Sequence, residues 1–181
     1  MEKALPLEWS LYGIAVTTVA DFTPGSPPTM SEPRPIVKGA FRVGVGVFSP
    51  DGKWIAYDSE EDGSSKIYVR PFPSGAPRIQ VSAGYGQQPR WSRKHEEIFY
   101  QSGDRTIHVA PLTIRGGGFI AGTPAQWSAV RPAYFGGSPT FDVFPDGEST
   151  VVLEAGSTGP SSHSHLVFVF NLLDEIRRKL P

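Results

Sequence analysis

Short apolar runs recur along the chain on either side of tight turns. The first hairpin frame occupies residues 48–57 and is centred on Pro50-Asp51-Gly52. The same alternation returns at residues 91–100, and again at residues 143–152 around Pro145-Asp146-Gly147. The three frames begin 43 and 52 residues apart. Because the blades of β-propellers repeat at about 40–50 residues, this spacing predicts a repeat protein built from short antiparallel strands.

The two Pro-Asp-Gly tripeptides are predicted to form tight turns. Proline presets φ, aspartate accepts hydrogen bonds from the backbone of its own turn, and glycine takes positive φ without strain. Asp51 and Asp146 are therefore interpreted as turn residues and not as catalytic carboxylates. The middle frame has lost all three residues and carries Arg93-Lys94-His95 in their place. We expect neighbouring strands to hold that turn.

Further strands accompany each hairpin in a constant order. A strand with a nearby proline precedes each hairpin, and an alternating strand follows it. The preceding strands are expected at residues 33–37, 77–81 and 122–127, and the following ones at residues 66–72, 106–112 and 165–170. Each unit then holds four short strands, which is the content of one propeller blade. The units are placed near residues 38–82, 84–128 and 138–170.

The two ends of the chain differ from the repeats. Residues 11–16 fit a strand, and residues 21–32 are an aperiodic Pro/Gly/Ser/Thr stretch that predicts a long loop. Residues 1–32 are therefore treated as a degenerate N-terminal part, and residues 33–181 as the repeats. At the other end Asn171 caps residues 171–180, which predicts a short helix.

These elements predict an all-β fold. It is a partial β-propeller of about three four-stranded antiparallel blades, about thirteen strands in all, with a short C-terminal helix. Aromatic side chains bury large apolar areas, so we expect those of the strands to form the core between blades. The expected core aromatics are Phe48, Trp54, Tyr57, Tyr68, Trp91, Phe99 and Tyr100.

The composition agrees with a β fold rich in turns. The 181 residues include 20 glycines and 18 prolines, which excludes a bundle of long helices because both residue types break helix interiors. The net charge of −1 gives no general attraction to nucleic acid or to an anionic membrane. Without cysteine, the chain has no disulfide, thiol catalyst or thiolate metal site. No signal peptide or transmembrane segment is visible.

Four other groups are candidate sites, and each has a simpler interpretation. His163 and His165 stand two apart, as metal ligands do, but no third ligand follows at a readable spacing. The acidic residues at 58–62 lack the closing glutamate of a calcium loop. Gly116-Gly117-Gly118 opens no helix, which indicates a flexible loop and not a phosphate cradle. His108 lies in an alternating strand, where we expect a packed histidine.

The repeats resemble a known family. The segments at residues 48–57, 67–73 and 88–100 are similar to the TolB-like, WD-type propeller repeat. Their order resembles most closely the C-terminal propeller of bacterial Ser/Thr protein kinases, whose last blade and terminal helix are similar to residues 141–176. The likeness covers roughly residues 33–181. The sequence departs from it at the middle turn, in residues 17–32, and at Phe144, where the family has serine.

The resemblance implies a non-catalytic module for binding, sensing or protein interaction within a larger signalling protein. The sequence carries no kinase motif, and we expect no catalytic residue, cofactor or metal. The partner would be a protein or a small ligand on a blade face, with no nucleic acid or membrane contact. Two alternatives stay open: the propeller cap of a hydrolase, and a degenerate fragment detached from a kinase domain.

Three blades are too few to close a ring. Closed propellers have about four to eight blades, so the end blades would carry unpaired strand edges. Such edges template pairing with another chain, which predicts either self-association or membership of a larger propeller. The compartment also stays open: periplasm if the segment follows a membrane-anchored kinase, and cytoplasm otherwise.

Overall fold

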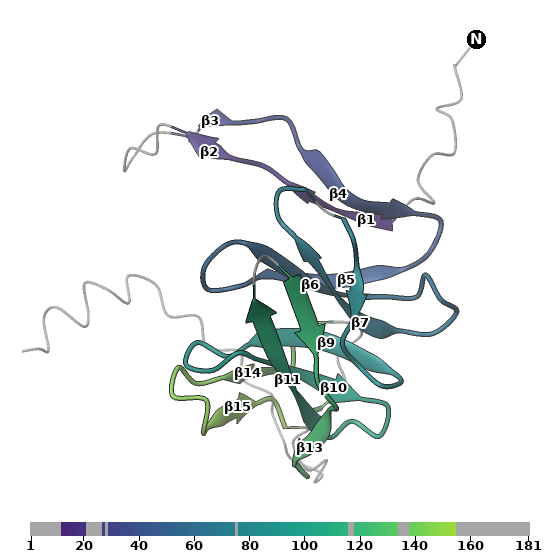
Figure 1. The fold of residues 1–181 in the computed structure, drawn as a ribbon, viewed down its shortest axis with the longest axis vertical. Helices are drawn as coiled ribbons and strands as arrows, with labels where there is room; N and C mark the ends of the chain where they lie inside the picture. Colours follow the sequence, from purple (N-terminus) through teal and green to yellow (C-terminus); the bar gives the residue numbers. More distant parts are fainter. Residues whose placement is uncertain are drawn as a thin grey trace, which may run out of the picture.

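A computed structural model describes residues 12–20, 27, 29–74, 76–115, 118–133 and 138–154 (Figure 1). These residues form an all-β fold of fifteen strands, with no helix among them. They include no helix of the length and hydropathy needed to cross a membrane. The predicted strand at 165–170, the predicted helix at 171–180 and the histidines His163 and His165 lie outside the described residues.

The first repeated unit forms a four-stranded antiparallel sheet. Its strands are β5 (Val43–Phe48), β6 (Trp54–Ser59), β7 (Lys66–Pro71) and β8 (Ile79–Gln80), and they neighbour one another in chain order. The backbone N–H of Ser49 donates to the carbonyl of Trp54 across the first turn at 2.9 Å. The strand content of the unit is the one that its apolar pattern predicts.

The second unit repeats this sheet and adds one strand. Its strands β9 (Gly86–Trp91) and β10 (Glu97–Ser102) begin 43 residues after β5 and β6. The next strand, β11 (Ile107–Arg115), pairs through its first half with β13 (Ala125–Ser128) and through its second half with β12 (Gly118–Ala121).

The added strand corrects the prediction of a glycine loop at Gly118, which begins β12, while Gly116 and Gly117 lie outside the described residues. The reason lies in the next residue. Phe119 is only 6% exposed, and its ring lies 5.2 Å from that of Trp54 and 6.5 Å from that of Trp91. Burial of this one aromatic side chain therefore favours a hairpin over a free loop.

Shorter pairs of strands lie at both ends of the described chain. The third unit contributes β14 (Phe141–Val143) and β15 (Thr150–Val152), and the N-terminal part contributes β1 (Tyr12–Val16) paired with β4 (Arg34–Gly39). The predicted loop at 21–32 is corrected at its C-terminal end, while residues 21–26 and 28 lie outside the described residues. Its last part holds β3 (Thr29–Met30), which pairs with β2 (Val19–Ala20). Ser31 stabilises this pair of strands, because its Oγ accepts a hydrogen bond from the N–H of Thr18 at 2.8 Å.

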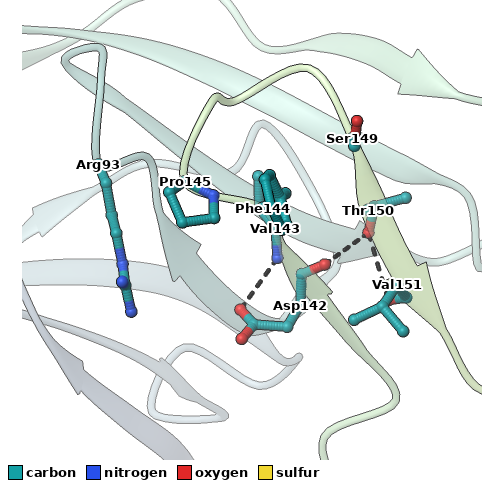
Figure 2. A pocket seen from close by; sticks show the side chains of 8 residues that line it. All are labelled: Arg93, Asp142, Val143, Phe144, Pro145, Ser149, Thr150 and Val151. Carbon is teal, nitrogen blue, oxygen red and sulfur yellow. Dashed lines mark hydrogen bonds between the residues drawn. The ribbon is translucent and has the colours of Figure 1, made fainter. Parts of the chain in front are cut away.

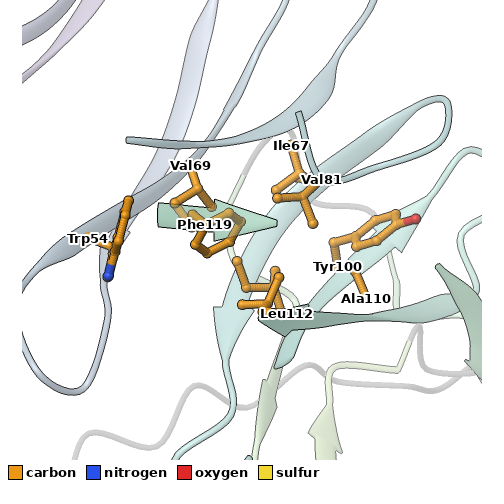
Figure 3. Packing of buried hydrophobic residues seen from close by; sticks show 10 residues of the cluster. Trp54, Ile67, Val69, Val81, Tyr100, Ala110, Leu112 and Phe119 are labelled. Carbon is orange, nitrogen blue, oxygen red and sulfur yellow. The ribbon is translucent and has the colours of Figure 1, made fainter. Parts of the chain in front are cut away.

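The core clusters pack the sheets against one another in chain order, with β1–β4 in the upper part of Figure 1 and β14–β15 in the lower part. The largest core cluster lies between the first and second units (Figure 3). A second cluster joins β1–β4 to the first unit, and a third joins the second unit to β14–β15. Removal of these apolar faces from water holds each sheet to the next.

Most of the expected core aromatics lie in these clusters. Five of the seven are no more than 5% exposed, namely Trp54, Tyr57, Tyr68, Phe99 and Tyr100. Trp91 is partly buried against the first cluster. Phe48 is the exception and corrects the prediction, because 47% of it is exposed. It is the last residue of β5, and its ring lies 5.1 Å from that of Phe72 in a T-shaped arrangement.

Candidate functional site

The Pro-Asp-Gly turns have the geometry that their residues favour. Gly52 and Gly147 have φ of +69° and +74°, in the left-handed region that costs glycine nothing. Oδ1 of Asp51 accepts from the N–H of Lys53 at 3.1 Å, and Oδ1 of Asp146 accepts from the N–H of Glu148 at 2.7 Å. Both carboxylates are thus engaged in their own turns.

The middle turn is held by other means. Oγ of Ser92 accepts from the backbone N–H groups of Lys94 and His95 at 3.3 and 3.0 Å. Nζ of Lys94 lies 3.5 Å from Oε1 of Glu148 in the third unit. In place of the Pro-Asp-Gly residues, the hydrogen bonds of Ser92 and the contact between Lys94 and Glu148 therefore stabilise this turn.

The acidic residues at 58–62 are all engaged with arginines. Glu60 lies 3.5 Å from Arg42, and Glu61 and Asp62 lie 3.4 and 3.2 Å from Arg78. No group of three metal-ligating side chains occurs in the described part of the chain. Asp58 differs from the other three, because it is only 1% exposed.

Asp58 joins the first two units. Its Oδ1 accepts from the N–H of Val45 at 3.0 Å and from the N–H of Gln88 at 3.2 Å. Val45 lies in β5 and Gln88 in β9, at equivalent positions 43 residues apart. One carboxylate oxygen therefore accepts a hydrogen bond from the equivalent backbone N–H group in each of two successive repeats. Gln88 has φ of +56°, an uncommon value for a residue with a side chain.

Gln88 continues this chain of hydrogen bonds into the third unit. Its Oε1 accepts from the N–H and the Oγ1 of Thr140 at 2.9 and 3.0 Å, and its Nε2 donates to the carbonyl of Ser138 at 2.8 Å. Thr140 lies 52 residues after Gln88 and so occupies the equivalent position of the third unit. Buried polar groups are costly unless paired. The relay Asp58–Gln88–Thr140 thus ties three units together through their first strands.

The surroundings of Asp58 disfavour its charge. Burial raises the pKa of its carboxyl above the ordinary value of 3.8, against the opposing effects of the Gln88 N–H and of Arg42. Its Oδ2 lies 3.5 Å from Nη1 of Arg42 and has no hydrogen-bond donor among the described residues. A Cβ on Gly44 would overlap this carboxylate. The glycine therefore makes the room in which the carboxylate sits.

Protonation of Asp58 is expected to increase the free energy of unfolding as the pH falls from the folded pKa of this group toward 3.8. Because its pKa is raised in the folded chain, the folded state binds this proton more readily than the unfolded state. Asp58 therefore lowers the stability as the pH rises from 3.8 through its folded pKa. The variant Asp58→Asn should lose this slope, measured as the midpoint of urea unfolding at a series of pH values.

Two other carboxylates provide the contrast. Hydrogen bonds, from Ser49 to Asp51 and from Arg78 to Asp62, lower the pKa of both groups below 3.8. Their stabilising contribution is present above 3.8 and is lost only below it. The two pH windows do not overlap. The same slope above 3.8 in the wild type and in Asp58→Asn would contradict the assignment.

A groove of about 710 Å³ opens where the first strands of the three units approach one another. This volume lies within the range of about 300–1,000 Å³ that is typical of ligand sites. Strands β5, β9 and β14 and the segments next to them supply its walls. The lining residues are Val45, Val47, Phe48, Pro50, Arg90, Trp91, Arg93, Pro139, Asp142 and Val143.

Three charged side chains line the groove, and two of them neutralise each other. Nε of Arg90 lies 3.4 Å from Oδ1 of Asp142, and its guanidinium stands over the ring of Phe141 at 5.8 Å. Burial lowers the pKa of Arg90, in spite of the nearby Asp142 and Asp58 carboxylates. Arg93 is exposed and forms no ion pair within the described residues. Among the side chains that the structure describes, the groove therefore carries one positive charge without an ion-pair partner.

A second hollow of about 300 Å³ adjoins the groove (Figure 2). Arg93 runs past Pro145 on one side of it, and Thr150 and Val151 of β15 stand on the other. Phe144, which is 61% exposed, also lines it. Arg93 and Asp142 line both hollows, so the two spaces share a wall.

The remaining candidate histidine lies elsewhere. His108 is in β11, half-buried, with its ring 5.7 Å from that of Tyr100. It lines a hollow of about 510 Å³ together with Asp104, Gln126 and seven other residues, none of which lines the groove. The packed histidine that the alternation predicts is therefore what the described structure contains.

No family model and no curated protein matches the chain. The function of the groove is therefore inferred from its geometry and from the repeats. Arg90 and Asp142 were not expected at a site, and Arg93 was expected only as a residue of the middle turn. One signal was present, since the repeats place Arg93 at the position of a turn proline, and a charge there is not needed for the turn.

Proposed function

We propose that the chain is a non-catalytic β-propeller segment of the TolB-like type, which binds a peptide segment of a partner protein in the groove between β5, β9 and β14. The repeat spacing and the packing of the sheets in chain order support the propeller assignment. In such a ring, further strands from the same protein or from a second copy would complete the blades.

The groove is the observation that carries the proposal. It combines apolar and aromatic walls with an arginine, and aromatic residues and arginine are enriched at the centres of protein interfaces. Phe48 contributes an exposed aromatic ring to it. Its position at the meeting point of three repeats gives it rigid walls, because the relay through Asp58 and Gln88 holds these strands in place.

Peptides selected from a random phage-displayed library on the immobilised chain are expected to bind in this groove. Replacing Phe48 with alanine should weaken the selected peptides about fivefold or more, which corresponds to about 1 kcal/mol of interface energy. Affinities are measured in solution by fluorescence anisotropy with the resynthesised peptides.

The matched control is Ile120→Ala. Ile120 is 68% exposed on β12 and does not line the groove, so its loss should leave the affinity unchanged. Selected peptides that bind wild type, Phe48→Ala and Ile120→Ala equally well would refute the proposal.

A further inference from the structure

The turn between β14 and β15 departs from the repeat at a residue that does not stabilise the turn. Phe144 occupies the position of Ser49 and Ser92 in the other units. Those two serines accept backbone hydrogen bonds, Ser49 from Trp54 at 3.0 Å and Ser92 from His95 at 3.0 Å. Phenylalanine cannot make this contact, and it leaves a large apolar side chain 61% exposed.

Arg93 departs from the repeat in the same region. It stands where the first and third units have a turn proline. It lines the groove, the hollow beside Phe144, and a third hollow of about 240 Å³ near Pro50. Arg90 pairs with Asp142, Lys94 with Glu148, and Lys53 with Asp51. Glu96, which lines the third hollow with Arg93, accepts from the N–H of Ile114 at 3.4 Å.

We infer that the groove takes an acidic peptide, with the guanidinium of Arg93 binding a carboxylate and the ring of Phe144 contacting an apolar side chain next to it. A guanidinium offers two parallel N–H donors that match a carboxylate. This inference rests on the proposed function, and it adds the chemistry of the ligand. The two repeat departures thus serve one binding surface.

A peptide fits this surface better than a nucleic acid does. Within the described residues the groove holds one cation without an ion-pair partner, and carboxylates at Asp51, Asp142 and Glu148 lie along its rim and in the adjoining turns. A phosphate backbone brings a row of negative charges and needs several cations. A single carboxylate flanked by an apolar side chain needs one cation and one aromatic face.

The experiment uses peptides selected on the wild-type chain, resynthesised in two forms. In the second form every Asp and Glu is replaced by its amide and the C-terminus is amidated. The uncharged form should bind about tenfold more weakly or worse. Arg93→Gln should weaken the charged form to the same extent and leave the uncharged form unaffected, because both changes remove the same contact.

Two further variants separate this contact from general effects. Phe144→Ser restores the residue of the other repeats and should keep the fold while weakening the charged peptide several-fold. Arg131→Gln is the matched control, because Arg131 is exposed and donates to the carbonyl of Asp104, at the end of β10 away from Arg93. It should leave the affinity unchanged.

The possible results distinguish the inference from the proposed function. Charged and uncharged peptides that bind equally well, and whose affinity depends on Phe48 and not on Arg93, would refute the acidic ligand. Peptide binding in the groove would then still be supported. If no peptide depends on Phe48, the proposed function fails and the inference fails with it. A fluorescein-labelled fifteen-nucleotide poly-thymidine strand that binds tighter than the peptides and needs Arg93 would overturn the peptide in favour of nucleic acid.

Discussion

Replacing Asp58 with alanine is expected to lower the free energy of unfolding by about 2–4 kcal/mol, because each buried donor left without an acceptor costs about 1–3 kcal/mol. The change leaves the N–H groups of Val45 and Gln88 without their acceptor, while Arg42 keeps Glu60 as its partner. Urea unfolding monitored by tryptophan fluorescence measures the loss. Hydrogen exchange should show faster exchange at both amides.

Glu60→Ala is the matched control for this variant. Glu60 also pairs with Arg42, but at the surface, with a side chain 43% exposed. Its removal should change the stability by no more than about 0.5 kcal/mol. Equal effects of Asp58→Ala and Glu60→Ala would show that the buried carboxyl does not join the first two units.

Phe99→Ala is expected to cost a similar amount, about 3–5 kcal/mol, through the loss of a fully buried aromatic ring. Phe99 is 0% exposed and lies in the cluster that joins the second unit to β14–β15. Its ring meets that of Trp127 edge to face at 5.2 Å. The truncation leaves a cavity between the two units, and chemical denaturation of the full chain measures its cost.

Phe144→Ala provides the comparison, because it removes the same atoms from the surface of the third unit. Phe144 is 61% exposed, so its truncation should change the free energy of unfolding by no more than about 0.5 kcal/mol. A loss at Phe99 no larger than that at Phe144 would mean that the third unit does not pack on the second.

The local chemistry of the chain was sufficient to place many strands and turns. The apolar frame 43 residues after the first places β9 and β10 relative to β5 and β6. The Pro-Asp-Gly tripeptides mark two hairpin turns, because their preferences act within four residues. The sequence did not predict the extra strand β12, because the glycines at its start indicate a loop. The strand is favoured by the burial of Phe119 against the first unit.

The groove could be predicted only in part. The resemblance indicated a binding module with its partner on a blade face. It did not show that Arg90 is neutralised by Asp142, since these residues lie 52 positions apart and meet only when the second and third units pack. Phe48 was expected in the core because its neighbours alternate correctly, but its place at the end of β5 leaves it exposed.

The sequence by itself determined the all-β class, the repeat and the tight turns, because strand alternation and turn residues are local properties. The tertiary structure alone decided that Asp58 is buried, that Gln88 takes a positive φ, and that Arg93 lines a hollow together with Phe144. These properties depend on which side chains from distant units share the same space. Burial and pairing are set by that proximity, and the order of residues does not encode it locally.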